Sequence, residues 1–394
     1  MPDFYLYDRP KHAAAVHQWL KKYDIVATKK RTTALDRKEK TMTLEELKIR
    51  QLTNQYLLAP ADKLTVMRDL CGVQAQFMTN ALHSLKIRTN DYDEQTVAEG
   101  LVKNWSVRGT VHVFAESDLP LFIRCNNGAD YRKNEWQGYS YMKNQRPCWA
   151  LTPERQKYLA DIIISAVAER AYTRDELKEL CRANGMTKIE EDCMFESWGG
   201  GIRELCVRGF MNYTVQEKKQ YISSPEFSPI PEEEAKIEIA RRYFTNIAPA
   251  TIHDAMYFTG AKQAEVKNWL RDLPVESFDF GGRTYYYIPN GKTYDGDIPH
   301  CIFLAGFDQL MLGYQKKESI YLKPEYLRGV FNLAGIVMPP LLIDGDVAGI
   351  WKNKNGKLEI KCFRSLSQAE KSYIEQAADK LWGDIKEVRY VDEG

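Results

Sequence analysis

The sequence predicts a fold of mixed α-helices and β-strands, in which three successive helix-and-hairpin units precede a β-rich C-terminal module. Between about residues 43 and 290, stretches with helical periodicity are followed three times by a pair of short alternating stretches. After residue 297 the pattern changes to short strands around Asp344-Gly345 and Asn355-Gly356, the strongest hairpin signals in the chain. In a winged helix, the helices are followed in the chain by a β-hairpin. We therefore interpret the chain as an α+β protein with tandem winged-helix (helix-turn-helix) units.

A chain of 394 residues is long enough for two to three domains and a large buried core. The changes of pattern predict the boundaries: an N-terminal extension 1–41, a first winged helix 42–150, a second 151–230, a third 231–296, and a β-rich module with a terminal helix 297–394. The spacing of the three units varies too much for a solenoid. We expect a tandem array instead.

The first unit begins at a capping box of Thr43 and Glu46, which precedes an amphipathic run to Leu70. Gly72 is expected to end this run, because glycine readily takes the left-handed conformation that closes a helix. A second helix should follow the segment Val73–Gln76. The sequence then predicts a third helix at about 95–102 and a strand pair at 106–114.

The second unit begins at Thr152-Pro153, since proline suits the first position of a helix. Thr173 and Glu176 form another capping box, and Asn184-Gly185 is expected to end that helix. The remaining elements of this unit are a third helix at 195–207 and a hairpin at 209–222 whose tip is Gln216–Lys219.

The third unit and the C-terminal module are predicted in the same way. For the third unit we expect helices at 235–244, 251–260 and 262–270, and two strands at 277–289 around Gly281-Gly282. For the module we expect strands at 340–343, 347–351 and 358–363, and a helix from a Ser367–Glu370 capping box to about Leu381. The module is interpreted as an antiparallel sheet or small barrel packed on the winged helices.

Composition and hydropathy restrict the function classes. No apolar run approaches the length that crosses a bilayer, and the N-terminus lacks a secretory apolar segment, so we expect a cytoplasmic protein without a membrane partner. The cysteines form no C-x-x-C pair and have no histidine at ligand spacing, so we expect reduced, mostly buried thiols, no metal site and no cofactor. They are Cys71, Cys125, Cys148, Cys181, Cys193, Cys206, Cys301 and Cys362.

The net charge does not by itself indicate a nucleic-acid partner, because 55 Lys and Arg oppose 54 Asp and Glu. Binding to DNA would require positive charge gathered on one face. The stretch Lys21–Lys40 is locally basic, although a solvated extension explains it equally well.

The segment Val73-Gln74-Ala75-Gln76 is the main candidate for chemistry. Two side chains two residues apart share a face only in an extended or irregular segment, so the two carboxamides can act at one place only if no helix has begun. The alternative is that both glutamines solvate the first turn of a helix. Some thirty residues later W-x-x-R-G-T-x-H follows, which contains Trp105, Arg108, Thr110 and His112.

These residues resemble the AlkZ family of winged-helix DNA glycosylases, whose catalytic signature is Gln, apolar residue, Gln. The resemblance runs from about Met42 to the C-terminus and includes the blocks LAGFDQLMLGY and IDGDVAGIW. A sister group, YcaQ-like, carries an acidic residue at the second polar position, so Gln76 places this chain nearer to AlkZ. The resemblance implies a monomeric, monofunctional glycosylase that acts on N7- or N3-alkylated purines in double-stranded DNA, and on interstrand crosslinks. It would be associated with the nucleoid when bound to DNA.

A carboxamide does not ionise near neutral pH and is a poor general base, so the substrate must supply its own activation. An alkylated purine is already cationic and leaves as a neutral base. Gln74 and Gln76 would then position water and stabilise an oxocarbenium-like sugar. A crosslinked base cannot be fully extruded, which favours an open face over a deep pocket. Aromatic residues that could stack on a base are Phe77, Trp105, Tyr139 and Tyr141.

The remaining candidates have structural alternatives. Expected phosphate contacts are Arg108, Lys218, Lys219 and Arg283, although hairpin tips are usually charged. Expected neighbours of the site are Trp105, Thr110, His112 and Asp308. The alternative makes Arg108 and His112 structural partners of the first wing, and Asp308 can merely cap a turn. The competing function is a non-catalytic winged-helix protein, either a transcription regulator or a damage binder. No lysine accompanies the two glutamines in the sequence, so a Schiff-base lyase step is not expected.

Overall fold

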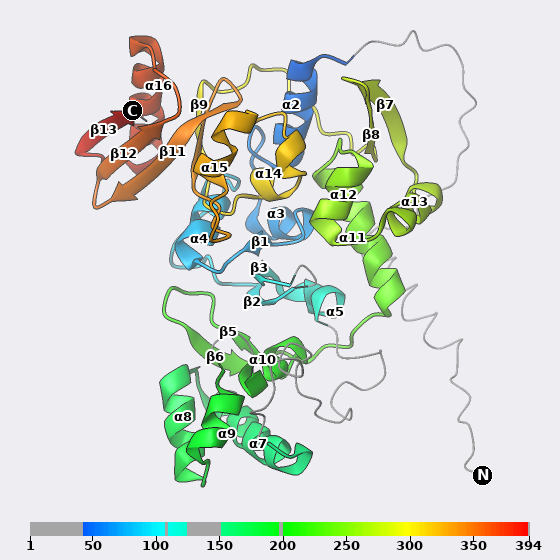
Figure 1. The fold of residues 1–394 in the computed structure, drawn as a ribbon, viewed down its shortest axis with the longest axis vertical. Coiled ribbons are helices and arrows are strands. Elements are labelled where there is room, and N and C mark those ends of the chain that lie inside the picture. The colour runs from blue at the N-terminus through cyan, green and yellow to red at the C-terminus, as the bar shows by residue number, and fades with distance from the viewer. Residues whose placement is uncertain (1–41, 107–108, 124–150, 197–199, 393–394) are drawn as a thin grey trace. The chain divides into compact units, whose positions relative to one another are not determined.

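The computed structural model describes residues 42–106, 109–123, 151–196 and 200–392 (Figure 1). All of them belong to one compact unit, Met42–Gly394, which combines α-helices with three β-sheets among the described residues. The predicted mixed α and β class is confirmed. The predicted domain boundaries inside this unit stay a prediction. The extension 1–41, with its basic stretch Lys21–Lys40, lies outside the described residues.

The first unit contains short helices around a strand pair. Its elements are α2 (Leu44–Asn54), α3 (Lys63–Asp69), β1 (Val73–Gln74), α4 (Met78–Lys86), β2 (Leu101–Trp105), β3 (Val111–Ala115) and α5 (Leu119–Phe122). The capping box of Thr43 and Glu46 is present at the start of α2. Gly72 has a φ of +78° and donates its N–H to Met67 O, so it closes α3 as expected.

Two predictions for this unit are wrong. The run from Thr43 to Leu70 is two helices, because the chain leaves the helical conformation at Tyr56, whose φ is +61°. No helix forms at 95–102. The Asp93 carboxylate accepts from the Gln95 N–H (2.9 Å) and the Thr96 hydroxyl (3.3 Å), which holds a turn instead. Leu101 and Val102 already belong to strand β2, where they pair with β3.

The second unit contains α7 (Pro153–Glu169), β4 (Tyr172–Thr173), α8 (Arg174–Ala183), α9 (Lys188–Met194), α10 (Gly200–Val207), β5 (Met211–Tyr213) and β6 (Gln220–Ser223). The capping box of Thr173 and Glu176 and the predicted hairpin are confirmed. The predicted single helix 195–207 is wrong. A further capping box, Thr187 with Glu190, starts α9 earlier, and Gly200 with a φ of +69° opens α10.

The third unit agrees with the sequence within a few residues. It consists of α11 (Glu232–Asn246), α12 (Ile252–Thr259), α13 (Gln263–Asp272), β7 (Glu276–Phe280) and β8 (Arg283–Tyr287). The Thr251–Asp254 capping box starts α12, and Gly260 ends it with a φ of +73°. These boundaries were predictable because each depends on residues within one helical turn.

The C-terminal module contains β9 (Cys301–Phe303), α14 (Gln309–Leu312), α15 (Leu327–Val330), β10 (Pro340–Ile343), β11 (Asp346–Lys354), β12 (Lys357–Cys362), α16 (Gln368–Trp382) and β13 (Glu387–Asp392). The sheet order is β13-β12-β11-β10-β9, so the sheet is open, and of the two predicted alternatives, a sheet or a small barrel, the barrel is wrong. The sheet is also not wholly antiparallel. Helix α16 crosses from the end of β12 to the start of β13, which makes this pair parallel.

The strands of the first and second units form one sheet, with the order β1-β3-β2-β5-β6-β4. Strands β2 and β5 meet at Lys103 and Tyr213. The buried amide of Asn104 donates to Cys206 O (3.0 Å), Met211 O (3.3 Å) and Asn212 Oδ1 (2.7 Å) in the second unit. The two units therefore share backbone and side-chain hydrogen bonds, which the sequence pattern did not predict.

We expect Gly72→Ala to destabilise the protein more than Gly282→Ala does. Both glycines have a positive φ, so either substitution strains the backbone by about 1 to 2 kcal/mol. A Cβ on Gly72 would also lie 2.6 Å from Val113 O, whereas a Cβ on Gly282 meets nothing within 4 Å. Overpacking at Gly72 should add about 1 to 3 kcal/mol. Urea unfolding followed by circular dichroism measures the difference. Equal midpoints for the two variants would show that β3 moves away from a Cβ on Gly72 without a cost in stability.

Candidate active site

The segment Gln74-Ala75-Gln76 is extended. Gln74 is the second residue of β1 and is paired with His112 of β3, and the Ala75 N–H donates to Val111 O (2.8 Å). Gln76 lies in a bend, and α4 begins only at Met78. Neither glutamine is therefore in the first turn of the helix, so the helix-solvating alternative is excluded.

The two glutamines differ in their surroundings. Gln74 is buried, with 9% of its surface exposed, and its carboxamide makes no hydrogen bond to any of the residues that the structure describes. Gln76 is exposed. The carboxamide of a residue that is buried to this extent ordinarily has a hydrogen-bond partner, either protein or water. Gln74 is thus suited to bind a water or a substrate atom, and Gln76 is in reach of a large ligand at the surface.

A row of polar side chains continues from Gln74 across the sheet. Gln74 is in register with His112, which is in register with Asn104 of β2, and side chains at paired positions project to the same face. His112 is fully buried. Its Nδ1 lies 3.0 Å from both Ser106 Oγ and Thr110 O, and 3.5 Å from Thr110 Oγ1. The structure thus brings His112 and Thr110 to the side of Gln74.

The other residues of this motif are placed differently. Trp105 is half-buried against the core of the second unit, and the Arg203 guanidinium lies over its ring at 3.7 Å from the centroid. It therefore has a packing partner of its own. Arg108, Tyr139 and Tyr141 lie outside the described residues.

Asp308 caps α14 by accepting from the Leu310 N–H (2.9 Å), which confirms the capping alternative. It also forms a bidentate ion pair with Arg88 at 2.6 and 3.0 Å, which the sequence did not reveal. Both side chains are fully buried. Because Arg88 directly follows the C-terminal end of α4, the pair fixes the helix that follows Gln76.

The segment 303–309 also contacts the chain on both sides of the glutamines. Phe303 O accepts from His83 Nε2 (2.8 Å) in α4, if that nitrogen carries the proton. Burial lowers the pKa of His83 to about 4, so its imidazole is neutral at pH 7. Gln309 Nε2 donates to Leu70 O (3.1 Å), just before Gly72. Residues of the C-terminal module therefore hold the chain just before and just after Gln74–Gln76.

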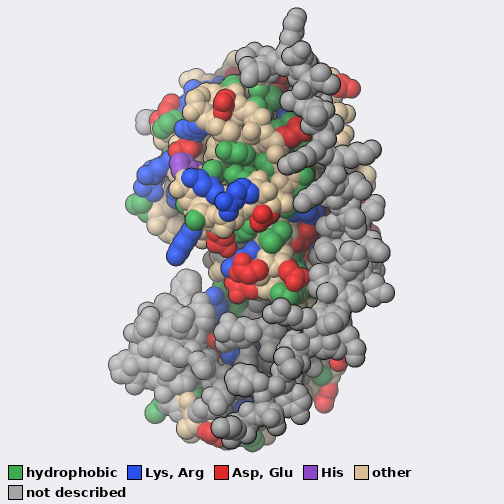
Figure 2. All heavy atoms as spheres, turned by 90° about the vertical axis from the view of Figure 1, so that its right-hand side faces the viewer, with side chains coloured by type: hydrophobic (Ala, Val, Ile, Leu, Met, Phe, Trp, Pro, Cys, Tyr) green, Lys and Arg blue, Asp and Glu red, His purple; other side chains and the backbone are tan. Residues whose placement is uncertain are grey.

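The basic residues expected to contact DNA occupy exposed positions. Lys218 and Lys219 are exposed in the β5–β6 connection. Arg283 in β8 is 3.2 Å from Glu318 Oε2, so its charge is already compensated. Figure 2 shows further Lys and Arg side chains gathered on the face that includes α12 and α13.

Lys267 and Arg271 of α13 are exposed residues that the sequence reasoning missed. They lie four residues apart, so they share one face of α13. This spacing was visible in the sequence and could have identified them.

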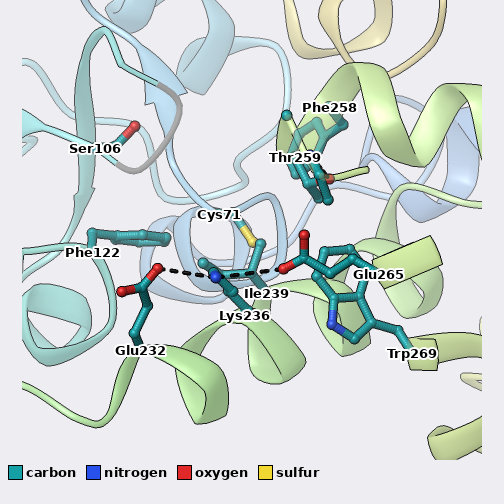
Figure 3. Close-up of a pocket in the computed structure, with 12 residues that line it drawn as sticks. Cys71, Ser106, Phe122, Glu232, Lys236, Ile239, Phe258, Thr259, Glu265 and Trp269 are labelled. Atoms are coloured by element: carbon teal, nitrogen blue, oxygen red, sulfur yellow. Dashed lines mark hydrogen bonds and ion pairs between the residues drawn. The ribbon is translucent and has the colours of Figure 1, made fainter. Parts of the chain in front are cut away.

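A cavity of about 380 Å³ is lined by Ser106, which also contacts His112, and by Cys71, which precedes Gly72 (Figure 3). Its wall is mainly apolar, and Lys236 bridges Glu232 (3.0 Å) and Glu265 (3.5 Å) across it. Neither Gln74 nor Gln76 lines this cavity. The cavity therefore shares Ser106 with the surroundings of His112, but the two glutamines are not part of its wall. None of the described helices is both long enough and apolar enough to span a bilayer.

Three comparisons relate the chain to known proteins. A family model described as DNA glycosylase AlkZ-like matches residues 67–382. A Streptomyces sahachiroi protein named interstrand DNA cross-link repair glycosylase is 24% identical over 335 residues, which cover 79% of this chain and 88% of that protein. The solved structure of Streptomyces sahachiroi DNA glycosylase AlkZ matches with a TM-score of 0.67 at 21% identity, over 89% of this chain and 100% of that one. The last match establishes a shared fold.

Proposed function

Because the chain belongs to the AlkZ-like family of DNA glycosylases, we propose that it hydrolyses the N-glycosidic bond of cationic N7- or N3-alkylated purines in duplex DNA. The observation that carries this proposal is the extended Gln74-Ala75-Gln76 segment. It combines a buried residue, Gln74, whose carboxamide makes no hydrogen bond within the described residues, with an exposed glutamine two residues later. Neutral carboxamides fit a substrate that is already activated by its own positive charge.

The reaction needs little from the protein beyond position and electrostatics. As the glycosidic bond stretches, its electron pair moves to the purine, which leaves neutral, and positive charge develops on the sugar. The carbonyl oxygens of Gln74 and Gln76 would stabilise this charge and accept a hydrogen bond from the attacking water. The water oxygen bonds to C1′, and its surplus proton passes to solvent.

The buried residues beside Gln74 would act through position. His112 borders Gln74 across the β1–β3 pair, and Thr110 and Ser106 hold its imidazole. Such a fixed neighbour limits the rotamers of Gln74. We assign His112 and Thr110 this supporting role and keep Arg108 as a phosphate contact.

The proposed chemistry extends to interstrand crosslinks. The relative from Streptomyces sahachiroi is named for their repair. Gln76 is exposed, and the glutamines do not line the cavity of Figure 3. A base that is tethered to the opposite strand would be easier to treat at an accessible face than in a deep pocket.

Incubation with a duplex that carries a single N7-methylguanine tests the proposal. Alkaline cleavage at the resulting abasic site should appear in proportion to time and enzyme concentration, and an undamaged duplex should stay intact. If no cationic adduct is excised, the competing function of a regulator or damage binder takes its place. A regulator should prefer one sequence, whereas a damage binder should prefer the lesion in any sequence.

We expect affinity for undamaged duplex to fall steeply with added salt, because the net charge is near zero and binding must use local basic residues. Replacing both Lys218 and Lys219 by alanine should lower the slope of log affinity against log salt by about one to two. Lys354→Ala, an exposed lysine in the C-terminal sheet, is the control and should leave the slope unchanged. Fluorescence anisotropy between 50 and 200 mM salt, roughly the range over which such contacts weaken, measures it. A slope that does not differ from that of the parent would remove the β5–β6 connection from the interface.

A further inference from the structure

Helix α4, directly after the two glutamines, begins without a side-chain cap. Six of the described helices have a hydroxyl residue at the N-cap whose side chain accepts from the first turn, namely Thr43, Thr152, Thr173, Thr187, Thr251 and Ser367. The N-cap of α4 is Phe77, whose side chain cannot accept from the exposed N–H groups of the first turn. The aromatic ring at this position therefore has no capping role, and its exposure needs another explanation.

Phe77 is also unusually exposed. It retains 45% of its surface, and it is the one phenylalanine or tryptophan among the exposed large hydrophobic residues of the described chain. Its ring is stacked on that of Phe307, with centroids 5.9 Å apart and an interplanar angle of 27°. Phe307 is buried. One face of the Phe77 ring is thus supported by protein, and the ring remains accessible beside the exposed Gln76.

The support beneath Phe77 is held in a strained conformation. Phe307 has a φ of +56°, in the left-handed region that favours glycine. The residues on either side are fixed. A Cβ on Gly306 would lie 2.7 Å from Asn80 Nδ2, and Asp308 is locked to Arg88. The Phe307 N–H donates to Val337 O (3.2 Å). The surrounding structure therefore determines where the Phe307 ring lies.

We propose that Phe77 is a stacking residue for the damaged DNA, and that Phe307 is the positioning residue behind it. In this arrangement the accessible part of the Phe77 ring stacks on a nucleobase next to the lesion and replaces the stacking that the duplex loses there. Gln76 is the preceding residue, so the stacked base would lie beside the carboxamide. This inference rests on the proposed function and names a contact of the same site.

The test compares binding to a duplex that contains a tetrahydrofuran abasic-site analogue with binding to the intact duplex. Phe77→Ala should reduce the preference for the analogue by about 5- to 150-fold, the range for one base stacked on an aromatic side chain. Phe77→Trp should keep the preference, whereas Phe77→Leu should lose it, because leucine supplies apolar surface without an aromatic face. Tyr158→Ala, at a similarly exposed aromatic residue in α7, is the matched control and should change nothing.

A second readout separates stacking from a structural effect. The duplex carries 2-aminopurine as the base next to the analogue. The fluorescence of 2-aminopurine should be lower when the parent protein is bound than when Phe77→Ala is bound, because a stacked fluorophore is quenched. Phe307→Leu keeps the apolar core and should give an intermediate result.

The outcomes separate the two proposals. If the parent excises N7-methylguanine and Phe77→Ala matches it in preference and fluorescence, the stacking inference is wrong and the glycosylase proposal stands. If the parent excises no adduct but Phe77 still governs binding to the analogue, the glycosylase proposal fails and the stacking contact remains.

Discussion

Gln74→Ala and Gln76→Ala are each expected to lower the rate of base excision by one to several orders of magnitude, with about 1.4 kcal/mol of barrier for each factor of ten. The expectation follows from the roles of the two carboxamides at the developing sugar cation and at the attacking water. Single-turnover excision of one N7-alkylguanine, and unhooking of a crosslinked duplex in parallel, measure the effect. Gln376→Ala, at an exposed glutamine of α16, is the matched control and should excise at the parent rate.

Stability should separate a catalytic role from a structural one. Gln74 is buried and makes no hydrogen bond to the described residues. Gln74→Ala should therefore leave the thermal unfolding midpoint unchanged or raise it slightly. Gln76→Asp recreates the acidic residue of the sister group and should retain more activity than Gln76→Ala. Alanine variants that excise at the parent rate would leave the glycosylase proposal without its mechanism.

Arg88→Met should destabilise the protein by about 3 to 5 kcal/mol, because it leaves the Asp308 carboxylate buried without its counter-ion. Both side chains are fully buried, and the pair is bidentate. The double variant Arg88→Met with Asp308→Leu should be more stable than Arg88→Met alone, since no unpaired charge remains. It should still lose the α14 cap, which contributes about 1 kcal/mol.

Urea unfolding of the single and double variants measures the coupling. The control is Lys157→Met, because the Lys157–Asp161 pair is exposed and should contribute less than about 1 kcal/mol. If Arg88→Met and Lys157→Met cost the same, the buried pair does not anchor α4. If Arg88→Met is destabilised as expected, its excision rate should also fall at temperatures below unfolding, because α4 directly follows Gln76.

The sequence by itself determined the elements whose causes are local. Capping boxes fix the starts of α2, α8, α12 and α16 within four residues, and the Asp344-Gly345 and Asn355-Gly356 turns fix the hairpins of the C-terminal sheet. The condition that Gln74 and Gln76 require an extended segment was also derivable from spacing alone. The family followed from motifs that the family model also matches, over residues 67–382.

The tertiary structure alone decided what depends on distant partners. Asp308 and Arg88 are 220 positions apart, so nothing near Asp308 in the sequence indicates that its partner holds α4. Residues 101–102 became strand because β3 supplied their hydrogen bonds, whereas the helical pattern around them had no comparable partner. The pairing of β2 with β5 and the parallel pairing of β12 with β13 were equally hidden. A local pattern records the preferences of a few neighbouring residues, but pairing and burial are settled by which distant surfaces satisfy each other's hydrogen bonds and exclude water.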